Sequence, residues 1–504
     1  MELLENRQVG VKRTVYDDGG GLADYVVADT RQSETMKAIL TAAPYSGTPI
    51  NKYRLLDDCY RASGGFETGE YIIPHPRESI EKYVRRKNMS YYINYVKPII
   101  DAHVNPIFKV EPTRQGMSNT YSLFINDVDG NNTSLTRFMK KVAINAKLHG
   151  VQFIVMDMEQ IDSNEIITES DIVNRRLYPY LYSISPSQVS NWSTDKYGKI
   201  NCISYCISTK EIDEDGNIKT IMEEWTWTNT SCRRTIDGVT TKFTNHLGMI
   251  PVIPVYGVIN ATDDLIPQSD LYGIARTSLA LMNACSELRE RNRQQAFSLL
   301  TYPIGDDDDY ESGDEPISIG TADMLMYRAS HSGRPEFITP PTDSSDMLMS
   351  EIQMMIREIY RQANMQFVTQ ELVSNVSGLA KAYDNLQLYE TINELVEGIQ
   401  SVEKKLAKLF GFYMGENMDN FSAVYNHEFG VSDVASTLAN ATTTLALNIC
   451  EGLNYETKRK VVRSMLNDVD PTVLDNVLKE LESMPNRGEA VDTTNVSVVQ
   501  PTGN

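Results

Sequence analysis

Two stretches of the chain decide its fold. Residues 267–299 read PQSDLYGIARTSLALMNACSELRERNRQQAFSL, and residues 343–363 read DSSDMLMSEIQMMIREIYRQA. Apolar residues recur at helical spacing in both, which predicts two amphipathic helices. These residues are Leu271, Ile274, Leu281, Cys285 and Leu288 in the first stretch, and Met347, Ile352, Met355, Ile359 and Ala363 in the second.

A small β-module is expected between the two helices. Short apolar runs predict strands at residues 299–304, near 317–327 and at 336–339. After residues 364–378, a third and longer helix begins at Leu379 and carries an apolar stripe as far as Leu409. We interpret this layout as a stem with a head at its end, which is typical of an assembly component rather than of a catalytic pocket.

The rest of the chain predicts an α+β fold. Residues 1–30 read as a flexible N-terminal arm, 31–175 as mainly helical and 178–258 as antiparallel strands. Helices are expected at 91–104 and 134–148, a buried strand at 151–156, and turns at 195–198, 213–217 and 236–238. Residues 430–484 carry further helices, one of them starting at the pair Asp470–Pro471. Residues 485–504 read as a disordered tail.

Length and composition describe an ordinary globular protein. The 504 residues suffice for two to four domains, with 41% hydrophobic and 23% charged residues. No apolar run approaches the roughly 20 residues that a membrane span needs, so no membrane partner is expected. The N-terminus carries no pattern of a secretory signal. Six scattered cysteines predict reduced thiols in a cytosolic protein.

The net charge of −21 limits how the protein can meet nucleic acid. Wrapping DNA requires lysine and arginine to neutralise phosphates, so this mode is disfavoured. An acidic wall past which DNA slides is compatible with the charge, because it repels phosphate. The charge by itself favours a role in solubility alone.

The search for catalytic and cofactor sites finds no candidates. The chain contains no phosphate-binding G-x-x-x-x-G-K-[ST], no G-x-S-x-G and no H-E-x-x-H motif. We therefore expect no catalytic residues, no cofactor and no metal site. Cys202 and Cys206 fall on one face of a predicted strand, and without further ligands nearby we interpret them as a pair of buried free thiols.

The β-module is strongly acidic. Between Pro303 and Pro340, nine Asp and Glu residues stand against Arg328 and Arg334, a balance of −7. The run Asp306–Asp309 lacks the spaced ligands of a calcium loop, which favours a solvated loop tip that could dock a basic partner. The alternative is a metal-dependent enzyme of unrecognised fold that uses the acidic 306–315 loop.

With this order of elements, the chain resembles the portal proteins of tailed bacteriophages over nearly its whole length. Two short motifs add to the resemblance. Ser377-Gly378-x-Ala380 is similar to the motif where the tunnel loop of portals enters the long helix, and residues 337–341 (FITPP) are similar to the strand that leaves the clip. Residues 93–108 and 149–156 also resemble the wing cores of such proteins.

The resemblance implies a multi-domain portal fold. Its parts would be an α/β wing (31–266), a first stem helix (267–298), a clip (299–341), a second stem helix (342–363), a tunnel loop (364–378), a long wing helix (379–428) and a helical crown (429–484).

The resemblance also implies a non-enzymatic function. Portals form a ring, usually of twelve subunits, at one capsid vertex, and the axial tunnel conducts double-stranded DNA during packaging and ejection. The expected partners are the terminase large subunit, the head-tail adaptor, and the major capsid and scaffolding proteins. The expected location is the virion, after assembly in the host cytoplasm.

Two sets of residues are candidates for these contacts. For DNA we predict the polar tunnel-loop residues Gln366, Thr369, Gln370, Ser374 and Asn375. The alternative is a loop that packs on its neighbour, with Phe367, Val368, Leu372 and Val376 buried. For partner docking we predict the clip tip, which comprises Asp306, Asp307, Asp308, Asp309, Tyr310 and Glu311. The basic end of the first stem helix, Arg289, Arg291 and Arg293, is expected to pair with acidic neighbours or to face the tunnel.

Overall fold

The computed structural model confirms the α+β class. The chain divides into two compact units, Met1–His427 and Glu428–Asn504, which are considered separately. The structure describes residues 51–158, 171, 175–212, 218–258, 264–295, 299–304, 324–328, 334–338, 343–369, 386–427, 429, 434–466 and 471–483. The predicted N-terminal arm and C-terminal tail lie outside these residues.

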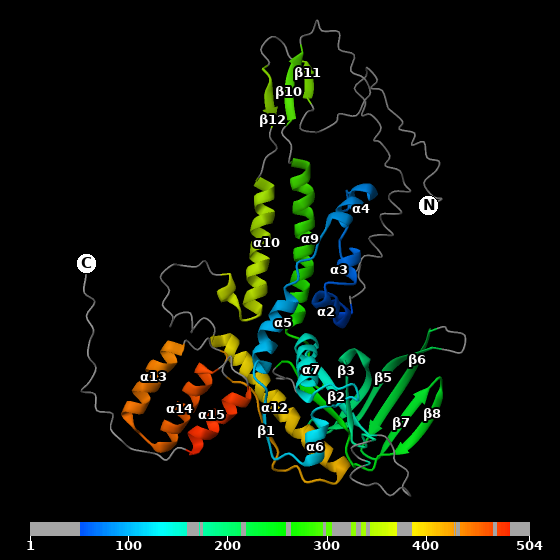
Figure 1. Ribbon diagram of the computed structural model, residues 1–504. Coiled ribbons are helices and arrows are strands. Elements are labelled where there is room, and N and C mark those ends of the chain that lie inside the picture. Colours follow the sequence, from blue (N-terminus) through cyan, green and yellow to red (C-terminus); the bar gives the residue numbers. More distant parts are fainter. Residues whose placement is uncertain are drawn as a thin grey trace, which may run out of the picture. The chain divides into compact units, whose positions relative to one another are not determined.

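Helices form the first part of the larger unit (Figure 1). Polar residues begin several of them, since the side chains of Asn51, Ser79 and Ser134 accept backbone N–H bonds in the first turns. The elements are α2 (Lys52–Arg61), α3 (Gly65–Thr68), α4 (Ile80–Met89), α5 (Val96–Val104), η1 (Asn105–Phe108), α6 (Asn119–Phe124) and α7 (Leu135–His149).

The helix predicted over residues 91–104 begins only at Val96. The preceding residues are not helical because their side chains bind the end of α2. The Tyr92 hydroxyl donates to the Cys59 carbonyl at 3.2 Å, and Asn94 Nδ2 donates to the Tyr60 carbonyl at 2.9 Å. Tertiary contacts therefore override the local helical pattern here.

Two antiparallel sheets contain the strands between residues 151 and 256. In the three-stranded sheet, β2 (Val151–Asp157) lies between β3 (Tyr180–Ile184) and β9 (Val252–Tyr256), and α7 packs against it. The other sheet is a meander of five strands: β4 (Val189–Thr194), β5 (Ile200–Ile212), β6 (Ile218–Thr228), β7 (Ser231–Ile236) and β8 (Val239–Thr244).

One face of the meander packs against the three-stranded sheet to form a common core. Phe153, Ile203 and Trp227 are buried together there, and Trp227 Nε1 donates to the Tyr205 hydroxyl at 3.0 Å. Two of the three predicted turns are confirmed, at 195–198 and 236–238, where Gly198 and Gly238 have positive φ. The third, 213–217, lies outside the described residues.

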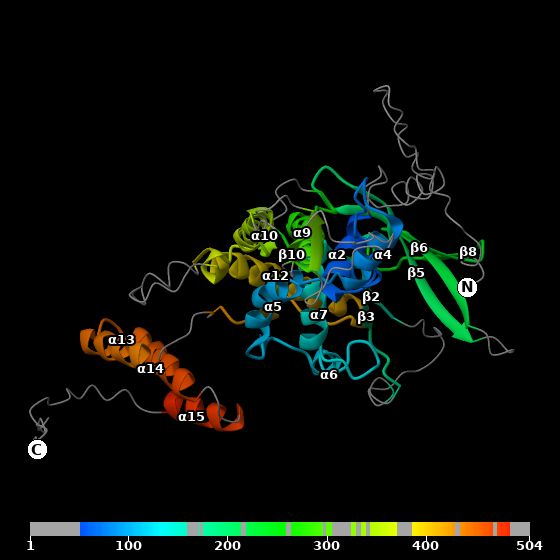
Figure 2. The same ribbon diagram turned by 90° about the horizontal axis from the view of Figure 1, so that it is seen from above.

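The helix–strand–helix order predicted for residues 267–363 is confirmed. Helices α9 and α10 lie side by side in both views (Figure 1 and Figure 2). In the small sheet between them, β10 runs parallel to β11 and antiparallel to β12. The elements are α9 (Leu271–Gln295), β10 (Leu299–Ile304), β11 (Met324–Arg328), β12 (Glu336–Ile338) and α10 (Asp343–Gln362).

The long helix α12 (Leu386–Met414) ends well before residue 428, to which the predicted long wing helix extends. Gly415 turns the backbone with φ +68°, and the Glu416 N–H closes the turn on the Gly411 carbonyl. The chain then returns as β13 (Ser422–Val424), which pairs with β1 (Thr113–Gln115). Residues 379–385 lie outside the described part.

A buried ion pair fixes α12 to this small sheet. Glu403 is fully buried in the middle of α12, and Arg114 Nε donates to its Oε1 at 2.6 Å. The Tyr425 hydroxyl donates to the other carboxylate oxygen. The carboxylate is thus both paired and hydrogen-bonded, as a buried charge requires.

The smaller unit contains three helices within the described residues: α13 (Val434–Leu447), α14 (Glu451–Met465) and α15 (Pro471–Ser483). Consecutive helices pack on each other. Helix α15 begins at Pro471, which agrees with the predicted proline at its first position.

Candidate functional site

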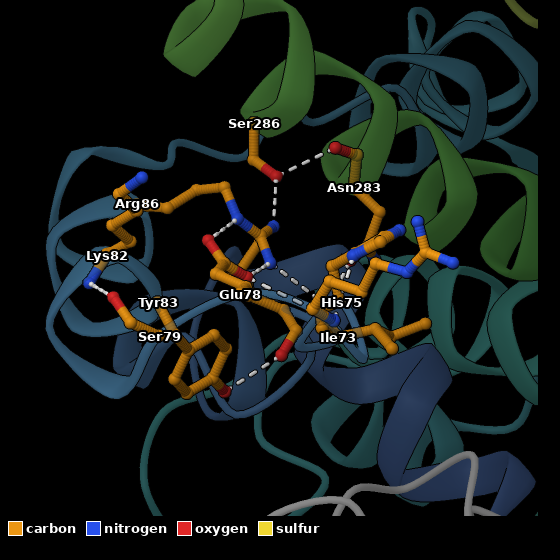
Figure 3. A network of polar contacts seen from close by, with 11 residues as sticks. Ile73, His75, Glu78, Ser79, Lys82, Tyr83, Arg86, Asn283 and Ser286 are labelled. Atoms are coloured by element: carbon orange, nitrogen blue, oxygen red, sulfur yellow. Dashed lines mark hydrogen bonds and ion pairs between the residues drawn. The ribbon is translucent and has the colours of Figure 1, made fainter. Parts of the chain in front are cut away.

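Helix α9 is held by a buried arginine from α4 (Figure 3). Arg86 is only 4% exposed. Its guanidinium binds Glu78 through two hydrogen bonds, Nε to Oε1 at 2.9 Å and Nη2 to Oε2 at 2.7 Å. A paired fork of this kind is the strong form of an arginine–carboxylate contact.

The same arginine reaches α9 and the loop before α4. Arg86 Nη1 donates to Ser286 Oγ at 2.9 Å, and Nη2 donates to the Ile73 carbonyl at 2.7 Å. One turn away on α9, Asn283 Oδ1 accepts the Ile73 N–H and Nδ2 donates to the Tyr71 carbonyl. We call Glu78, Arg86, Asn283 and Ser286 the α9 clamp.

Both charges of the clamp are stabilised in their ionised forms. Burial alone would raise the pKa of Glu78, but hydrogen bonds from Arg86 and from the His75 backbone outweigh it, so the pKa is lowered. Burial likewise opposes the charge of Arg86, and Glu78 more than compensates, so the pKa of Arg86 is raised. No sequence pattern predicts the clamp, because Arg86 and Ser286 lie 200 residues apart.

The C-terminal half of α10 and the residue after it pack closely on α9. Ile359 is fully buried, and Met355 and Ala363 are nearly so. A Cβ atom on Gly273 of α9 would lie 2.8 Å from Gln362 Oε1, so glycine permits the close approach of the two helices. Met355, Ile359 and Ala363 thus form the side of this segment that is buried within the subunit.

Three methionines of α10 are exposed. Met347 is 73% exposed, Met354 61% and Met349 47%. Met347, which marks the same predicted helix as Ile359, therefore lies on an exposed side of α10. At about 100° per residue, Met347 lies roughly 120° around the helix from Ile359, which is on the contact face. Met347 and Met354 lie about 20° apart around the helix, whereas Met349 lies about 160° from Met347. We call Met347 and Met354 the methionine face of α10.

The chain turns back towards α12 directly after α10. Asn364 adopts a left-handed conformation (φ +57°), and its Nδ2 donates to Thr391 Oγ1 at 3.2 Å. The short helix η3 (Gln366–Val368) follows. Thus the first residues of the predicted tunnel loop are anchored to the start of α12.

Two of the five predicted DNA-contact residues lie in the described part of this loop. Gln366 Nε2 donates to Gln387 Oε1 at 3.4 Å, and Thr369 Oγ1 donates to the Gln366 carbonyl at 3.1 Å. Val368 is 47% exposed within the single subunit, so its burial against a neighbour stays a prediction. Gln370, Ser374 and Asn375 lie outside the described residues, as do Leu372 and Val376.

The small sheet exposes aromatic residues. Tyr302 is 48% exposed and Phe337 70%. Phe337 pairs with Leu300, two positions from Tyr302 on β10, so both aromatic residues share one face of the sheet. We call this the aromatic face. The predicted docking tip, Asp306 to Glu311, lies outside the described residues.

The basic end of α9 contacts the segment around α4. The guanidinium of Arg289 lies 5.4 Å from the centre of the Tyr91 ring, and Arg293 Nη1 lies 2.9 Å from the Met89 sulfur. The predicted roles of Arg289 and Arg293, pairing with acidic neighbours or facing the tunnel, stay predictions.

Other candidate sites can be assessed only in the part of the chain that the structure describes. There, no group of three or more His, Cys, Asp or Glu side chains could hold a metal ion. Cys202 and Cys206 are free thiols on the same face of β5, opposite Thr228 and Glu224. Both are only partly buried, so the prediction that they are buried is wrong. None of the described helices combines the length and apolar character that crossing a membrane requires.

Comparisons with known proteins give structural matches only. No protein-family model matches the chain, and no curated protein does. Three solved chains, each 12% identical, superpose on most of its length. They come from the virion of a native gene transfer agent (GTA) particle (TM-score 0.41, 86% of this chain and 98% of that chain), the neck of an empty GTA particle computed with C6 symmetry (0.42, 84% and 98%) and the neck of a native GTA particle computed with C12 symmetry (0.41, 86% and 99%). Such low TM-scores do not establish a common fold, so the functional proposal relies on the elements above.

Proposed function

We propose that the protein is a phage portal subunit. It assembles into a ring, usually of twelve copies, at one capsid vertex, and the ring conducts double-stranded DNA during packaging and ejection. The observation that carries the proposal is the pair α9–α10 with a three-stranded sheet inserted between the helices. The order of elements in portals is the same: stem helix, clip, second stem helix and long wing helix.

The exposed methionine face is evidence for a neighbouring subunit beside α10. Full burial of a methionine side chain stabilises by about 1.5–3 kcal/mol relative to exposure. Met347 and Met354 lie seven residues apart, two helical turns, so their side chains follow one line along α10. A second copy in a ring would cover this line, as a heterologous interface requires.

The aromatic face supports docking at the clip. Tyr302 and Phe337 are exposed aromatic residues of the type that anchors protein interfaces. We assign the aromatic face, together with the acidic tip Asp306–Glu311, to the terminase large subunit during packaging and to the head-tail adaptor afterwards. The capsid and scaffolding proteins would surround the ring, which resides in the virion after assembly in the host cytoplasm.

The tunnel loop supports weak contact with DNA. A phosphate oxygen needs a donor, and the Gln366 amide retains one N–H beyond its bond to Gln387. Thr369 already donates its hydroxyl hydrogen to the Gln366 carbonyl, which makes it the poorer candidate. Gln370, Ser374 and Asn375 remain part of this proposal. Neutral donors guide DNA without the tight hold that charged side chains would give.

Electron microscopy of the purified chain tests the ring. We expect rings with a central hole from the wild type, and their loss in Met347→Glu/Met354→Glu, because two carboxylates would be buried against the neighbour. Met222→Glu is the matched control, since Met222 is 55% exposed on β6. Loss of rings in the control alone would contradict the assignment.

The absence of catalysis in the ring is a separate expectation. The DNA is driven by the terminase ATPase, so the purified ring should show no ATPase or nuclease turnover of its own. Turnover that survives purification and disappears with a single substitution in this chain would overturn the proposal.

A further inference from the structure

The exposed stripe of α12 carries charges that are separated by sign. Glu390, Glu394 and Glu397 occupy its first half, and Lys404 and Lys408 its second. All five are exposed, as are the apolar residues at its two ends, Leu386 (47%) and Phe412 (60%). At about 100° per residue, these positions lie within one quadrant of the helix.

This separation works against the isolated helix. Glu390 and Glu394 are four residues apart, as are Lys404 and Lys408, and like charges at this spacing repel. The helix dipole favours acids in the first turn and bases in the last only. Glu394 and Lys404 lie eight and ten residues from the respective ends of α12, which is beyond that range.

Most of these charges have no counter-ion within the subunit. Among the residues that the structure describes, Glu390, Glu394 and Lys404 form no ion pair. Lys408 Nζ has Asp419 Oδ1 at 3.5 Å, and both side chains stay largely open to solvent. The stripe therefore has an acidic half and a basic half, and most of their charges are not neutralised within the described part of the subunit.

Apart from Glu397, whose mirror position is the uncharged Ser401, the pattern is symmetric about residue 399. Glu390 and Lys408 are each nine residues from that point, Glu394 and Lys404 five, and Leu386 and Phe412 thirteen. When a second copy of the helix is laid antiparallel across this point, every carboxylate of these pairs faces an ammonium. Each Leu386 then faces a Phe412.

We propose that the exposed stripe of α12 binds the same stripe of a second copy, antiparallel and about a two-fold axis near residue 399. The occupant is a second copy because the charge pattern is complementary to itself. A two-fold contact uses one patch on both chains, so it differs from the head-to-tail contact that closes a ring. It would join subunits of two rings, or two free subunits, and it goes beyond the ring proposal.

Charge reversal tests this pairing. We would compare wild type, Glu390→Lys/Glu394→Lys, Lys404→Glu/Lys408→Glu and the fourfold variant by sedimentation velocity over a concentration series. In 0.05 M salt the wild type should show a doubling of mass, which 0.5 M salt weakens because exposed ion pairs are screened. Each twofold variant should self-associate at least about tenfold more weakly, because four attractive pairs become repulsive.

The recovery of self-association when both sets of charges are reversed is the decisive part of this experiment. The fourfold variant, and an equal mixture of the two twofold variants, should regain the doubling because opposite charges face each other again. Glu67→Lys/Glu81→Lys is the matched control, with two exposed acids reversed outside α12. A wild type without salt-sensitive doubling would overturn the inference, and so would a fourfold variant as weak as the twofold variants.

Disulfide trapping tests the direction of the pairing independently. In a Cys450→Ser background, which removes the exposed cysteine, a Glu397→Cys chain and a Ser401→Cys chain are mixed and oxidised. Antiparallel pairing brings residues 397 and 401 of two copies opposite each other. Identical positions are offset by four residues, about 6 Å along the axis. Together with the distance between the packed helices, this offset places their Cα atoms beyond the roughly 7 Å separation that a disulfide allows. We expect mixed disulfides to dominate, and equal yields of mixed and like disulfides would overturn the arrangement. Ring images of the same samples report on the proposed function separately.

Discussion

Helices α9 and α10 lie side by side but are built for different surroundings. Helix α9 contacts α2, α4, α5, α7 and α10, and the clamp ties it to segments far away in sequence. Helix α10 packs mainly on α9 and exposes three methionines. Helix α9 therefore belongs to the interior of the subunit, whereas α10 has a face that stays exposed in the described part of the chain.

The largest effect is expected at the clamp. Arg86→Ala leaves the buried Glu78 carboxylate without its partner, which should lower the free energy of unfolding by about 3–5 kcal/mol. Arg357→Ala, on an exposed position of α10, should change it by less than about 0.5 kcal/mol. Urea unfolding followed by circular dichroism measures both. Equal, small losses would mean that α9 is no better anchored than α10.

The second largest loss of unfolding free energy is expected at the contact between α9 and α10. Ile359→Ala removes a fully buried side chain and should cost about 2–5 kcal/mol. Met354→Ala, five residues away on the methionine face, should cost less than about 0.5 kcal/mol in the isolated subunit. A thermal or urea titration of dilute protein compares them. If Met354→Ala were as costly, α10 would be packed on both sides within one chain.

Near the start of α9, the free energy of unfolding should depend on pH. Burial, and then the charge of Lys147, lower the pKa of His103 to about 4, and Lys147 Nζ binds Asp270 just before α9 at 2.6 Å. Because the pKa is lower in the folded than in the unfolded chain, stability is present above about pH 6.5 and is lost towards pH 4, by up to about 3 kcal/mol.

The check is the unfolding free energy at several pH values. His103→Gln should flatten its decline between pH 6.5 and 4, while His246→Gln, at an exposed histidine, should leave the wild-type profile unchanged. Parallel profiles for wild type and His103→Gln would show that His103 does not titrate with folding.

Local patterns in the sequence predicted the elements but not what joins them. Strand β10 has the bounds expected from its apolar run, and α15 starts at its proline. The clamp and the Arg114–Glu403 pair join residues 200 and 289 positions apart, and neither leaves a local periodicity. The early end of α12 also depends on distant contacts, because β13 pairs with β1.

Less of the candidate site than of the fold could be predicted from the sequence. Helical spacing marks Met347 as apolar but cannot tell which of two apolar faces meets α9. The side chains of Gln366 and Thr369 form hydrogen bonds that no sequence pattern indicates. The docking tip at residues 306–311 stays a prediction.

The central claim is that a second copy covers the methionine face, and oxidative footprinting tests it most directly. Met347 and Met354 should oxidise several-fold more slowly in the assembled ring than in the dilute subunit, because a neighbour excludes the oxidant. Met222, 55% exposed on β6, is the internal reference and should oxidise equally in both states. Equal oxidation of Met347 and Met354 in both states, or a protein that never exceeds a dimer, would contradict the account.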